Sequence, residues 1–318
     1  MEQADISTDH SVDVHHQATL LHAWAQEYTQ LRPGNFTGSV STLRNGGVKL
    51  FSERMNRAIF QIGALPAPRL AFGLPIRAAG HNYICGEEGN DHSLLIFSGP
   101  SGFEFLSSED FEFYGIEIDT DISDDPVFLT MVKTLEEEIV TSSSRAIRLD
   151  AMRAGKLARL LGAILSEEGI GERLQAWPDG AAAFNRGLVG WVLDMLQVAS
   201  PEQERPPIRH WDTIAAIRNL VTERACCPLS VAELTVELDL SRRTLQNACQ
   251  EIVGLSPVQY LRALRLSEAR RMMERATTVT EVATQFGFWH LGYFARDYHT
   301  MFGELPSKTL ERVRRGQA

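Results

Sequence analysis

Two segments near the end of the chain repeat one pattern: a short capped helix, a tight turn and a second helix. In the first segment, Ser230 is a good N-cap, Glu233 three residues later completes a capping box, and Ser241 caps the helix after the turn. In the second segment, Gly287 makes the turn before a helix over about 290–301. The repeated pattern predicts two helix-turn-helix units.

One long helix is expected to join the two units. Gly254 ends the first unit, and Ser256 and Pro257 open the next helix as N-cap and first helical residue. This helix over about 257–274 would be roughly 27 Å long. Its predicted core-facing residues are Val258, Leu261, Leu266, Ala269 and Met272, and its arginines are Arg262, Arg265, Arg270, Arg271 and Arg275.

The second helix of each unit has a predicted outward face. In the first unit, Leu245, Ala248, Cys249 and Ile252 have the spacing of a buried stripe. The side chains that remain outside are hydrogen-bond donors of the kind that reach phosphates and purine edges in a major groove. The candidate DNA-binding residues are Arg242, Arg243, Gln246, Asn247 and Gln250 in the first unit and Trp289, His290, Tyr293 and Arg296 in the second. The aromatic residues Phe286, Phe288, Phe294, Tyr298 and Phe302 are assigned to the core.

The charge of the chain is unevenly spread. Residues 208–318 contain 15 Lys and Arg against 12 Asp and Glu, a net charge of +3. Because the whole chain has a net charge of −10, residues 1–207 have a net charge of −13. A basic domain joined to an acidic one is one sign of a module that binds a polyanion. We therefore expect the DNA-binding function in residues 208–318.

Residues from about 36 to 119 have the pattern of β structure. Segments 36–43 and 48–53 flank Asn45-Gly46-Gly47, which suits a hairpin turn, and short strands are expected at 94–97, 102–106 and 111–118. In the last of these the apolar positions change phase at Tyr114-Gly115, which predicts a β-bulge. The spacing favours a small barrel or jelly roll.

Helical spacing begins after Pro126, with helices expected over 127–140, 147–168 and 181–198. The stretch 199–207 contains three prolines and is expected to be a linker. The expected organisation is therefore a domain over 1–200 with a disordered start at about 1–20, the linker, and a domain over 208–318. Neither a membrane span nor a signal peptide is evident, so we expect a cytoplasmic protein.

The carboxyl-terminal pattern resembles the DNA-binding domain of AraC/XylS-type transcriptional regulators. The resemblance covers about 211–315 and is carried by LSVAEL, LSRRTLQ, GLSPVQYLRALRLSEARRMM, VTEVATQFGFWH and YFARDYHTMFGELPS in the order of that family. It implies an α+β fold: an amino-terminal cupin-like β-barrel or jelly-roll sensor and dimerisation domain with packed helices, then an all-α domain of two helix-turn-helix units joined by a long helix. Gly292 replaces a polar residue usual in the family.

The sequence predicts no cofactor, no metal site and no catalytic residue. His81 and His92, with Glu87 and Glu88 between them, lack the His-x-His pair and carboxylate that metal-binding cupins present. The aromatic residues expected in the barrel core are Phe97, Phe103, Phe105, Phe111, Phe113 and Tyr114. A barrel of this size can also leave room for one small ligand, and the residues around such a ligand cannot be identified from the strand pattern.

The function expected from these features is that of a sequence-specific DNA-binding transcriptional regulator. The family resemblance favours a ligand-responsive activator. The expected partners are double-stranded DNA, read in two major-groove segments per protomer, a small-molecule effector and a second copy of the chain, with RNA polymerase as a further candidate and no membrane partner. Two alternatives remain: a cupin-type enzyme with an appended DNA-binding domain, and a dimeric DNA-binding protein without an effector.

Overall fold

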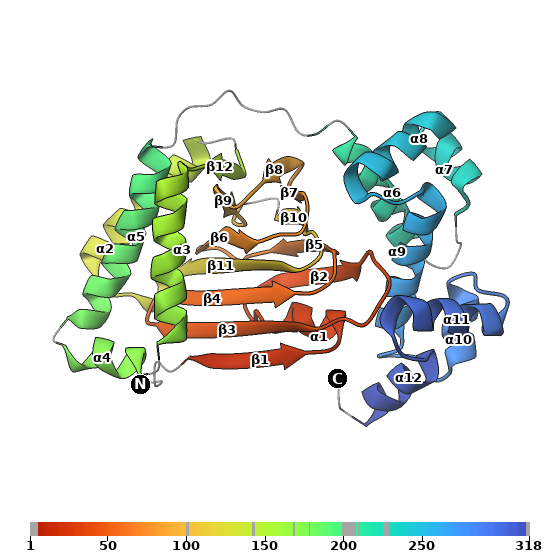
Figure 1. The fold of residues 1–318 in the computed structure, drawn as a ribbon, viewed down its shortest axis with the longest axis horizontal. Coiled ribbons are helices and arrows are strands. Elements are labelled where there is room, and N and C mark those ends of the chain that lie inside the picture. Colours follow the sequence, from red (N-terminus) through yellow and green to blue (C-terminus); the bar gives the residue numbers. More distant parts are fainter. Residues whose placement is uncertain are drawn as a thin grey trace.

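The fold is α+β, with antiparallel sheets in the amino-terminal half followed by an all-helical part (Figure 1). The computed structural model describes residues 6–99, 102–141, 144–167, 169–177, 179–198, 208, 210–224 and 229–315. One sheet has the strand order β1-β3-β4-β11-β6-β9-β12 and the other β2-β5-β10-β7-β8. The expected linker at 199–207 lies outside the described residues.

The strands are β1 (Ser7–Ser11), β2 (Ala25–Gln30), β3 (Gly38–Asn45), β4 (Val48–Met55), β5 (Ile59–Ala64), β6 (Arg69–Arg77), β7 (Asn82–Ile84), β8 (Glu87–Gly89), β9 (Ser93–Ile96), β10 (Phe103–Leu106), β11 (Phe111–Asp119) and β12 (Ala146–Arg148). The helices are α1 (Val14–Thr19), α2 (Pro126–Thr141), α3 (Ala151–Ser166), α4 (Ile170–Ala176), α5 (Gly180–Val198), α6 (Trp211–Glu223), α7 (Val231–Glu237), α8 (Arg242–Ala248), α9 (Pro257–Met272), α10 (Val279–Gln285), α11 (Leu291–Phe302) and α12 (Pro306–Arg314). Among these described helices, none is both long and apolar enough to cross a membrane.

Aromatic rings fill the space between the two sheets. The ring of Phe97 lies 5.0 Å from that of Phe103, 5.5 Å from Phe105 and 5.2 Å from Trp24, measured between centroids. Five of the six aromatics expected in the barrel core are buried there. The exception is Tyr114, which is half-buried and packs toward the helices on the other side of the sheet.

The predicted bulge at Tyr114-Gly115 is wrong. Strand β11 pairs with β4 in continuous register, and the shift relative to β6 lies between Glu112 and Phe113. The apolar phase changes because both faces of β11 are buried. Phe111 and Phe113 point into the space between the sheets, whereas Ile116 and Ile118 point toward the helices. On the inner face the second half of the strand carries Gly115, where a Cβ would lie 2.0 Å from the ring of Phe51, and the buried Glu117.

Helices α2, α3 and α5 cover the outer face of the seven-stranded sheet (Figure 1). Their apolar stripes are buried there, and the stripes of α3 and α5 include Leu157, Leu161 and Val192. The expectation that a helix begins at Ile147 is wrong, because Ile147 lies in β12 and pairs with Leu94 of β9. Helix α3 begins at Ala151, where Asp150 accepts hydrogen bonds from the first turn.

The expected disorder at 1–20 is wrong for residues 6–20. Strand β1 pairs with β3, and α1 buries Val14 and Ala18 between the sheets. Asp13 caps α1 by accepting hydrogen bonds from the backbone N–H groups of His15 and His16. Both histidines are partly buried, and burial lowers the pKa of His15 to about 3. The order comes from long-range packing, which local composition does not report.

The outer face of the five-stranded sheet is covered by the carboxyl-terminal domain. The ring of Trp211 in α6 stacks on Phe60 of β5 at 5.7 Å, and its Nε1 donates a hydrogen bond to Glu104 of β10 at 2.9 Å. Leu31 and Leu106 from the sheet side belong to the same buried cluster as α6. The two domains therefore share a core at this contact.

A fully buried carboxylate, Glu53, lies among the aromatic side chains between the two sheets. Glu53 of β4 has no exposed surface and accepts hydrogen bonds from Gln17 Nε2 at 2.9 Å and from the Tyr28 hydroxyl at 3.0 Å. Burial raises the pKa of Glu53 to about 7, against the effect of these two hydrogen bonds. A carboxyl group whose folded pKa exceeds its unfolded pKa favours folding at low pH and loses that contribution as the pH rises through the folded value.

We expect Glu53→Gln to stabilise the protein above pH 7. The substitution removes a buried charge, and the new amide can donate to Gln17 Oε1, which has no hydrogen-bond partner among the described residues. The gain in unfolding free energy at pH 8 should reach about 3 kcal/mol and shrink toward pH 4.5, since one pKa unit corresponds to roughly 1.4 kcal/mol. Urea unfolding across this pH range measures it. The exposed Glu223→Gln is the control, and equal curves for the two variants would contradict the prediction.

Candidate nucleic-acid interface

The first helix-turn-helix unit is built as its capping residues predict. Ser230 accepts a hydrogen bond from the backbone of Glu233, whose carboxylate in turn accepts from the backbone of Ser230. Ser241 caps α8 through the backbone N–H of Thr244. The helix continues past α8 as a π-turn over Cys249–Val253 and ends at Gly254 in a left-handed conformation. We call α8 with its π-turn the first recognition helix.

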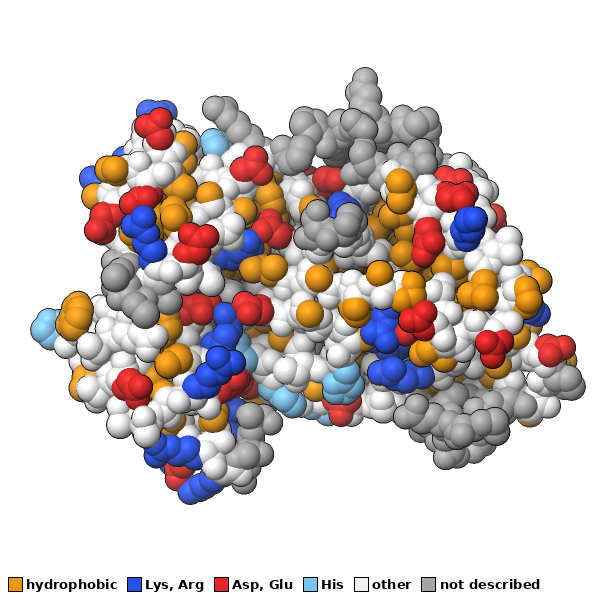
Figure 2. Space-filling view, turned by 180° about the vertical axis from the view of Figure 1, so that it is seen from behind, with side chains coloured by type: hydrophobic (Ala, Val, Ile, Leu, Met, Phe, Trp, Pro, Cys, Tyr) orange, Lys and Arg blue, Asp and Glu red, His pale blue; other side chains and the backbone are white. Residues whose placement is uncertain are grey.

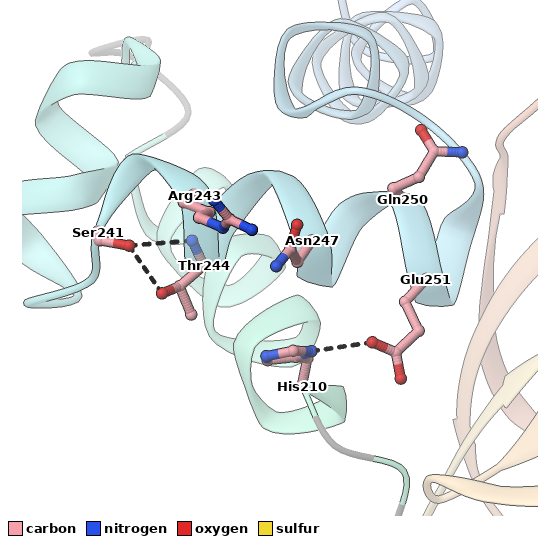
Figure 3. Close-up of a pocket in the computed structure, with 7 residues that line it drawn as sticks. All are labelled: His210, Ser241, Arg243, Thr244, Asn247, Gln250 and Glu251. Atoms are coloured by element: carbon pink, nitrogen blue, oxygen red, sulfur yellow. Dashed lines mark hydrogen bonds and ion pairs between the residues drawn. The ribbon is translucent and has the colours of Figure 1, made fainter.

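Polar side chains project from the first recognition helix. Leu245, Ala248 and Cys249 are fully buried, as predicted, and burial raises the pKa of the Cys249 thiol to about 12. The predicted DNA-binding residues of this unit are all exposed: Arg242, Arg243, Gln246, Asn247 and Gln250. Three of them, Arg243, Asn247 and Gln250, line one shallow depression of about 520 Å³ along the helix (Figure 3).

Four further residues border this depression and were not among the predicted DNA-binding residues: His210, Ser241, Thr244 and Glu251. His210, at the start of α6, lies across from the recognition helix, and its Nδ1 is 3.2 Å from a carboxylate oxygen of Glu251 (Figure 3). The pair brings one carboxylate to the end of an otherwise donor-rich face. No local signal marks His210, because its position depends on how α6 packs against α8.

The second helix-turn-helix unit has a different outward face. Helix α10 is capped by Thr278, Gly287 makes the turn with φ of 75°, and α11 follows as the second recognition helix. Its predicted DNA-binding residues, Trp289, His290, Tyr293 and Arg296, are all exposed. The core aromatics of this unit are buried as expected, except that Phe288 is half-buried.

Exposed aromatic surface is the unusual feature of this face. Trp289 is 73% exposed and Tyr293 is 58% exposed. The guanidinium of Arg296 lies 4.9 Å from the centre of the Tyr293 ring, and the ring of His290 meets Tyr293 edge-on at 5.7 Å. The stacked ring restricts the arginine, so its planar donor group is presented in fewer orientations than a free side chain would have.

An ion pair that the sequence did not reveal attaches α11 to α9. Arg262 Nη2 lies 2.6 Å from Asp297, which is also 3.5 Å from Arg296 Nε. Asp297 is mostly buried. Its Oδ2, the oxygen that faces Arg262, accepts no hydrogen bond of good geometry from the described residues. This carboxylate lies under the exposed arginine and links it to the connecting helix.

The first turn of α11 is not capped by a side chain. The N-cap residues of α7, α8, α9 and α10 each accept a hydrogen bond from the turn that follows, whereas His290 accepts none within the described part of the chain. The free backbone N–H groups at a helix start carry partial positive charge and suit an anion such as a phosphate. The helix start lies beside Trp289 and His290 and adds to the donor set of this face.

The connecting helix α9 departs from prediction at two positions. Val258 is 61% exposed rather than buried. Arg270, which was not among the predicted core-facing residues, is buried, and its Nη2 lies 2.7 Å from Asp13 and 2.6 Å from Glu304. Arg312 of α12 pairs with the same two carboxylates. Although burial disfavours its charge, the pKa of Asp13 is held well below its usual range by Arg270 and the neighbouring basic groups.

The histidines weighed as metal ligands stay apart from a common centre. His81 Nδ1 lies 2.5 Å from Glu88, whereas His92 Nδ1 lies 3.6 Å from Asp91. Glu87 instead accepts the backbone N–H of Arg145 at 2.8 Å. Among the described residues, no group of three His, Cys, Asp or Glu side chains is placed to hold a metal ion.

Comparison with known proteins agrees with this geometry. A family described as a helix-turn-helix domain matches residues 234–312. The probable thc operon regulatory protein of Rhodococcus erythropolis is 38% identical over 90 residues, which are 27% of each chain. The XylDLEGF operon transcriptional activator of Pseudomonas putida is 35% identical over 102 residues, 31% of this chain and 29% of that one.

The carboxyl-terminal domain is of the AraC/XylS type. The matched region spans less than a third of these two relatives, so the sequence similarity is that of one domain. A solved structure of the AraC-like transcriptional activator CuxR resembles 84% of this chain and 96% of its own, with a TM-score of 0.42 at 13% identity. In the AraC/XylS-type domain of this chain, α8 and α11 are the second helices of the two units.

We expect Trp289 to contribute little to stability. Trp289→Ala should change the free energy of unfolding by less than about 0.5 kcal/mol, because the ring is mostly exposed. The matched core change, Phe294→Ala in the same unit, should cost about 3–5 kcal/mol, because that ring is fully buried. Denaturant unfolding measures both. A cost for Trp289→Ala close to that for Phe294→Ala would assign Trp289 to the core instead.

Proposed function

We propose that this protein is a sequence-specific DNA-binding regulator of transcription. The observation that carries the proposal is the presence of two recognition helices in one domain, each with an exposed donor face and both attached to α9. A helix of this kind fits the major groove, and two of them on one support can read successive turns of DNA, about 34 Å apart. The relatives named as operon regulators support the same proposal, which would place the protein in the cytoplasm.

The amino-terminal domain is proposed to sense a small molecule, and the response to be activation. Two of the relatives' names support activation, since they are operon transcriptional activators. Buried ionisable groups in the interior, Glu53 and the ion pair of Lys49 with Glu117, are of the kind found at binding sites more often than in plain cores. The enzyme alternative finds no support in the names of the relatives, which are regulators.

A second copy of the chain and RNA polymerase complete the proposed partners. Helices α2 and α5 pack side by side and leave Leu129 and Trp191 partly exposed, the latter by 38%. A symmetric dimer across these two helices would cover both residues.

Selection of genomic fragments by the purified full chain tests the proposed function. We expect enrichment of a few specific sites, each protected as two short blocks about one helical turn apart. Affinity for these sites should fall steeply between 50 and 200 mM salt, because contacts to phosphates release bound counterions, roughly one per contact. Binding that shows neither site preference nor salt dependence would refute the proposal.

Arg296→Ala should weaken binding to the selected site by about 1–3 kcal/mol, the range of one base-edge contact, and relax base preference in one of the two blocks only. Competition binding with base-substituted sites measures this. The matched control is Arg44→Ala, an exposed arginine on β3. Equal loss on specific and random DNA would assign Arg296 to a phosphate, and no loss would remove it from the interface.

Sedimentation of the full chain at micromolar concentration tests the dimer. We expect a dimer, and we expect Trp191→Glu to shift it to a monomer, because a charge would then face its own copy across the axis. Trp177→Glu, at an exposed tryptophan outside α2 and α5, is the control. A monomeric wild-type protein would exclude the dimer.

A further inference from the structure

One loop of the amino-terminal domain contacts the ends of both recognition helices. The β2–β3 loop, taken here from Gln30, the last residue of β2, to residue 37, leaves the sheet beside α9 and reaches both helix-turn-helix units (Figure 1). No sequence pattern indicated a role for this loop, most of which precedes the first predicted strand at 36–43. Its contacts fall at the carboxyl-terminal ends of the two helices, away from the residues predicted to bind DNA.

At the first recognition helix the contact is made by Arg32. Its Nη2 donates to the carbonyl of Val253 and its Nη1 to that of Gly254, each at 3.2 Å. A cation at the carboxyl end of a helix is favourable, because the last carbonyl groups carry partial negative charge. Gly254 has φ of +62°, which favours glycine, and a Cβ there would lie 2.6 Å from Arg32 Nη2, so the arginine approaches this helix end closely.

The second recognition helix is held in a similar way. Gln30 Nε2 donates to the carbonyl of Met301 at 2.7 Å, and the backbone N–H of Gly34 lies 3.0 Å from the same carbonyl and 3.1 Å from that of Thr300. Gly303 ends α11 with φ of +76°, and a Cβ there would lie 1.6 Å from Asn35 Oδ1. The terminal glycines of both recognition helices are therefore the points where the loop passes.

The loop itself is well supported. Gln30 is fully buried, and its Nε2 also donates to the carbonyls of Arg32 and Gly34, each at 2.8 Å. Leu31 is buried in the cluster shared with α6, and Phe36 is buried between the sheets. Because both ends of the loop are anchored in buried clusters, the position of the loop is fixed independently of the two helix ends that it contacts.

Within the carboxyl-terminal domain, the two units are joined mainly through α9. Their buried clusters are separate, one formed with α6 to α8 and the other with α10 to α12, and each uses a different part of α9. A single shared helix permits one unit to roll or bend relative to the other. The loop is a second connection, between the carboxyl-terminal ends of the two recognition helices, and it restricts this relative motion of the units.

We propose that the β2–β3 loop sets the distance and orientation between the two recognition helices, and that Gln30 and Arg32 are therefore positioning residues for the choice of spacing between the two DNA segments. This inference rests on the proposed DNA-binding function. It assigns the loop to positioning rather than to blocking, because all nine predicted DNA-binding side chains stay exposed while the loop is in place.

The test uses the full chain and the DNA site that it selects. One base pair is inserted or removed between the two protected blocks, which turns one block by about 35° relative to the other. Wild-type affinity should fall roughly tenfold on either change, as for a lost base contact. Arg32→Ala and Gln30→Leu should each reduce this penalty to about threefold or less, since the looser units can follow the altered DNA. Arg44→Ala should behave as wild type.

Each outcome is decisive. Arg32→Ala releases the end of the first recognition helix, and Gln30→Leu releases the end of the second. Either variant therefore tests the proposal if its thermal transition shows that it is folded. A spacing penalty equal to that of the wild type in a folded variant would overturn the proposal. So would loss of all DNA binding in a folded variant, which would make the loop part of the binding surface. Absence of any DNA binding by the wild type would instead refute the proposed function.

Discussion

The contact between Trp211 and the five-stranded sheet determines how the rest of the molecule is arranged. This sheet is apolar on both faces, so its outer face needs a cover, and α6 supplies it. Glu104 accepts hydrogen bonds from Trp211 Nε1 and from Arg218, whose guanidinium lies 5.0 Å above the Phe60 ring. The contact joins buried apolar area with an ion pair of Arg218 and Glu104, which fixes the orientation of α6 as well as its position.

A second contact at the other end of α9 is mainly ionic. Asp13 and Glu304 pair with Arg270 and Arg312, and Arg270 also lies 4.6 Å from the ring of Phe302. Breaking a buried network of this kind is costly, because it leaves charges without partners. Lys and Arg side chains gather at this end of the molecule, near α12 (Figure 2). The carboxyl-terminal domain is thus held at both ends. Separating it from the amino-terminal domain would expose Trp211 and leave Arg270 without Asp13.

The carboxyl-terminal domain was predictable because its signals are local. Capping residues such as Ser230, Ser256 and Thr278, together with Gly254 and Gly287, set helix ends within a few residues, and the apolar spacing identified the buried side of α8. The amino-terminal half was predicted only in outline. Strands β1 and β2 and helix α1 are ordered by partners far away in the chain, and the phase change in β11 reflects cover on both faces rather than a bulge. The buried state of Arg270 depends on Asp13, 257 positions earlier, which no spacing rule can reveal.

The hydrogen bonds to Glu53 connect the ionic contact at Asp13 with the β2–β3 loop. Gln17 lies in α1, the helix that Asp13 caps, and Tyr28 lies in β2, the strand that leads into the β2–β3 loop. A proton or a bound molecule that changes this carboxylate therefore acts on both structural elements through a shared acceptor. Neither α1 nor β2 can withdraw its hydrogen bond without leaving this buried carboxylate with one partner fewer, which is costly, so the positions of the two elements depend on each other.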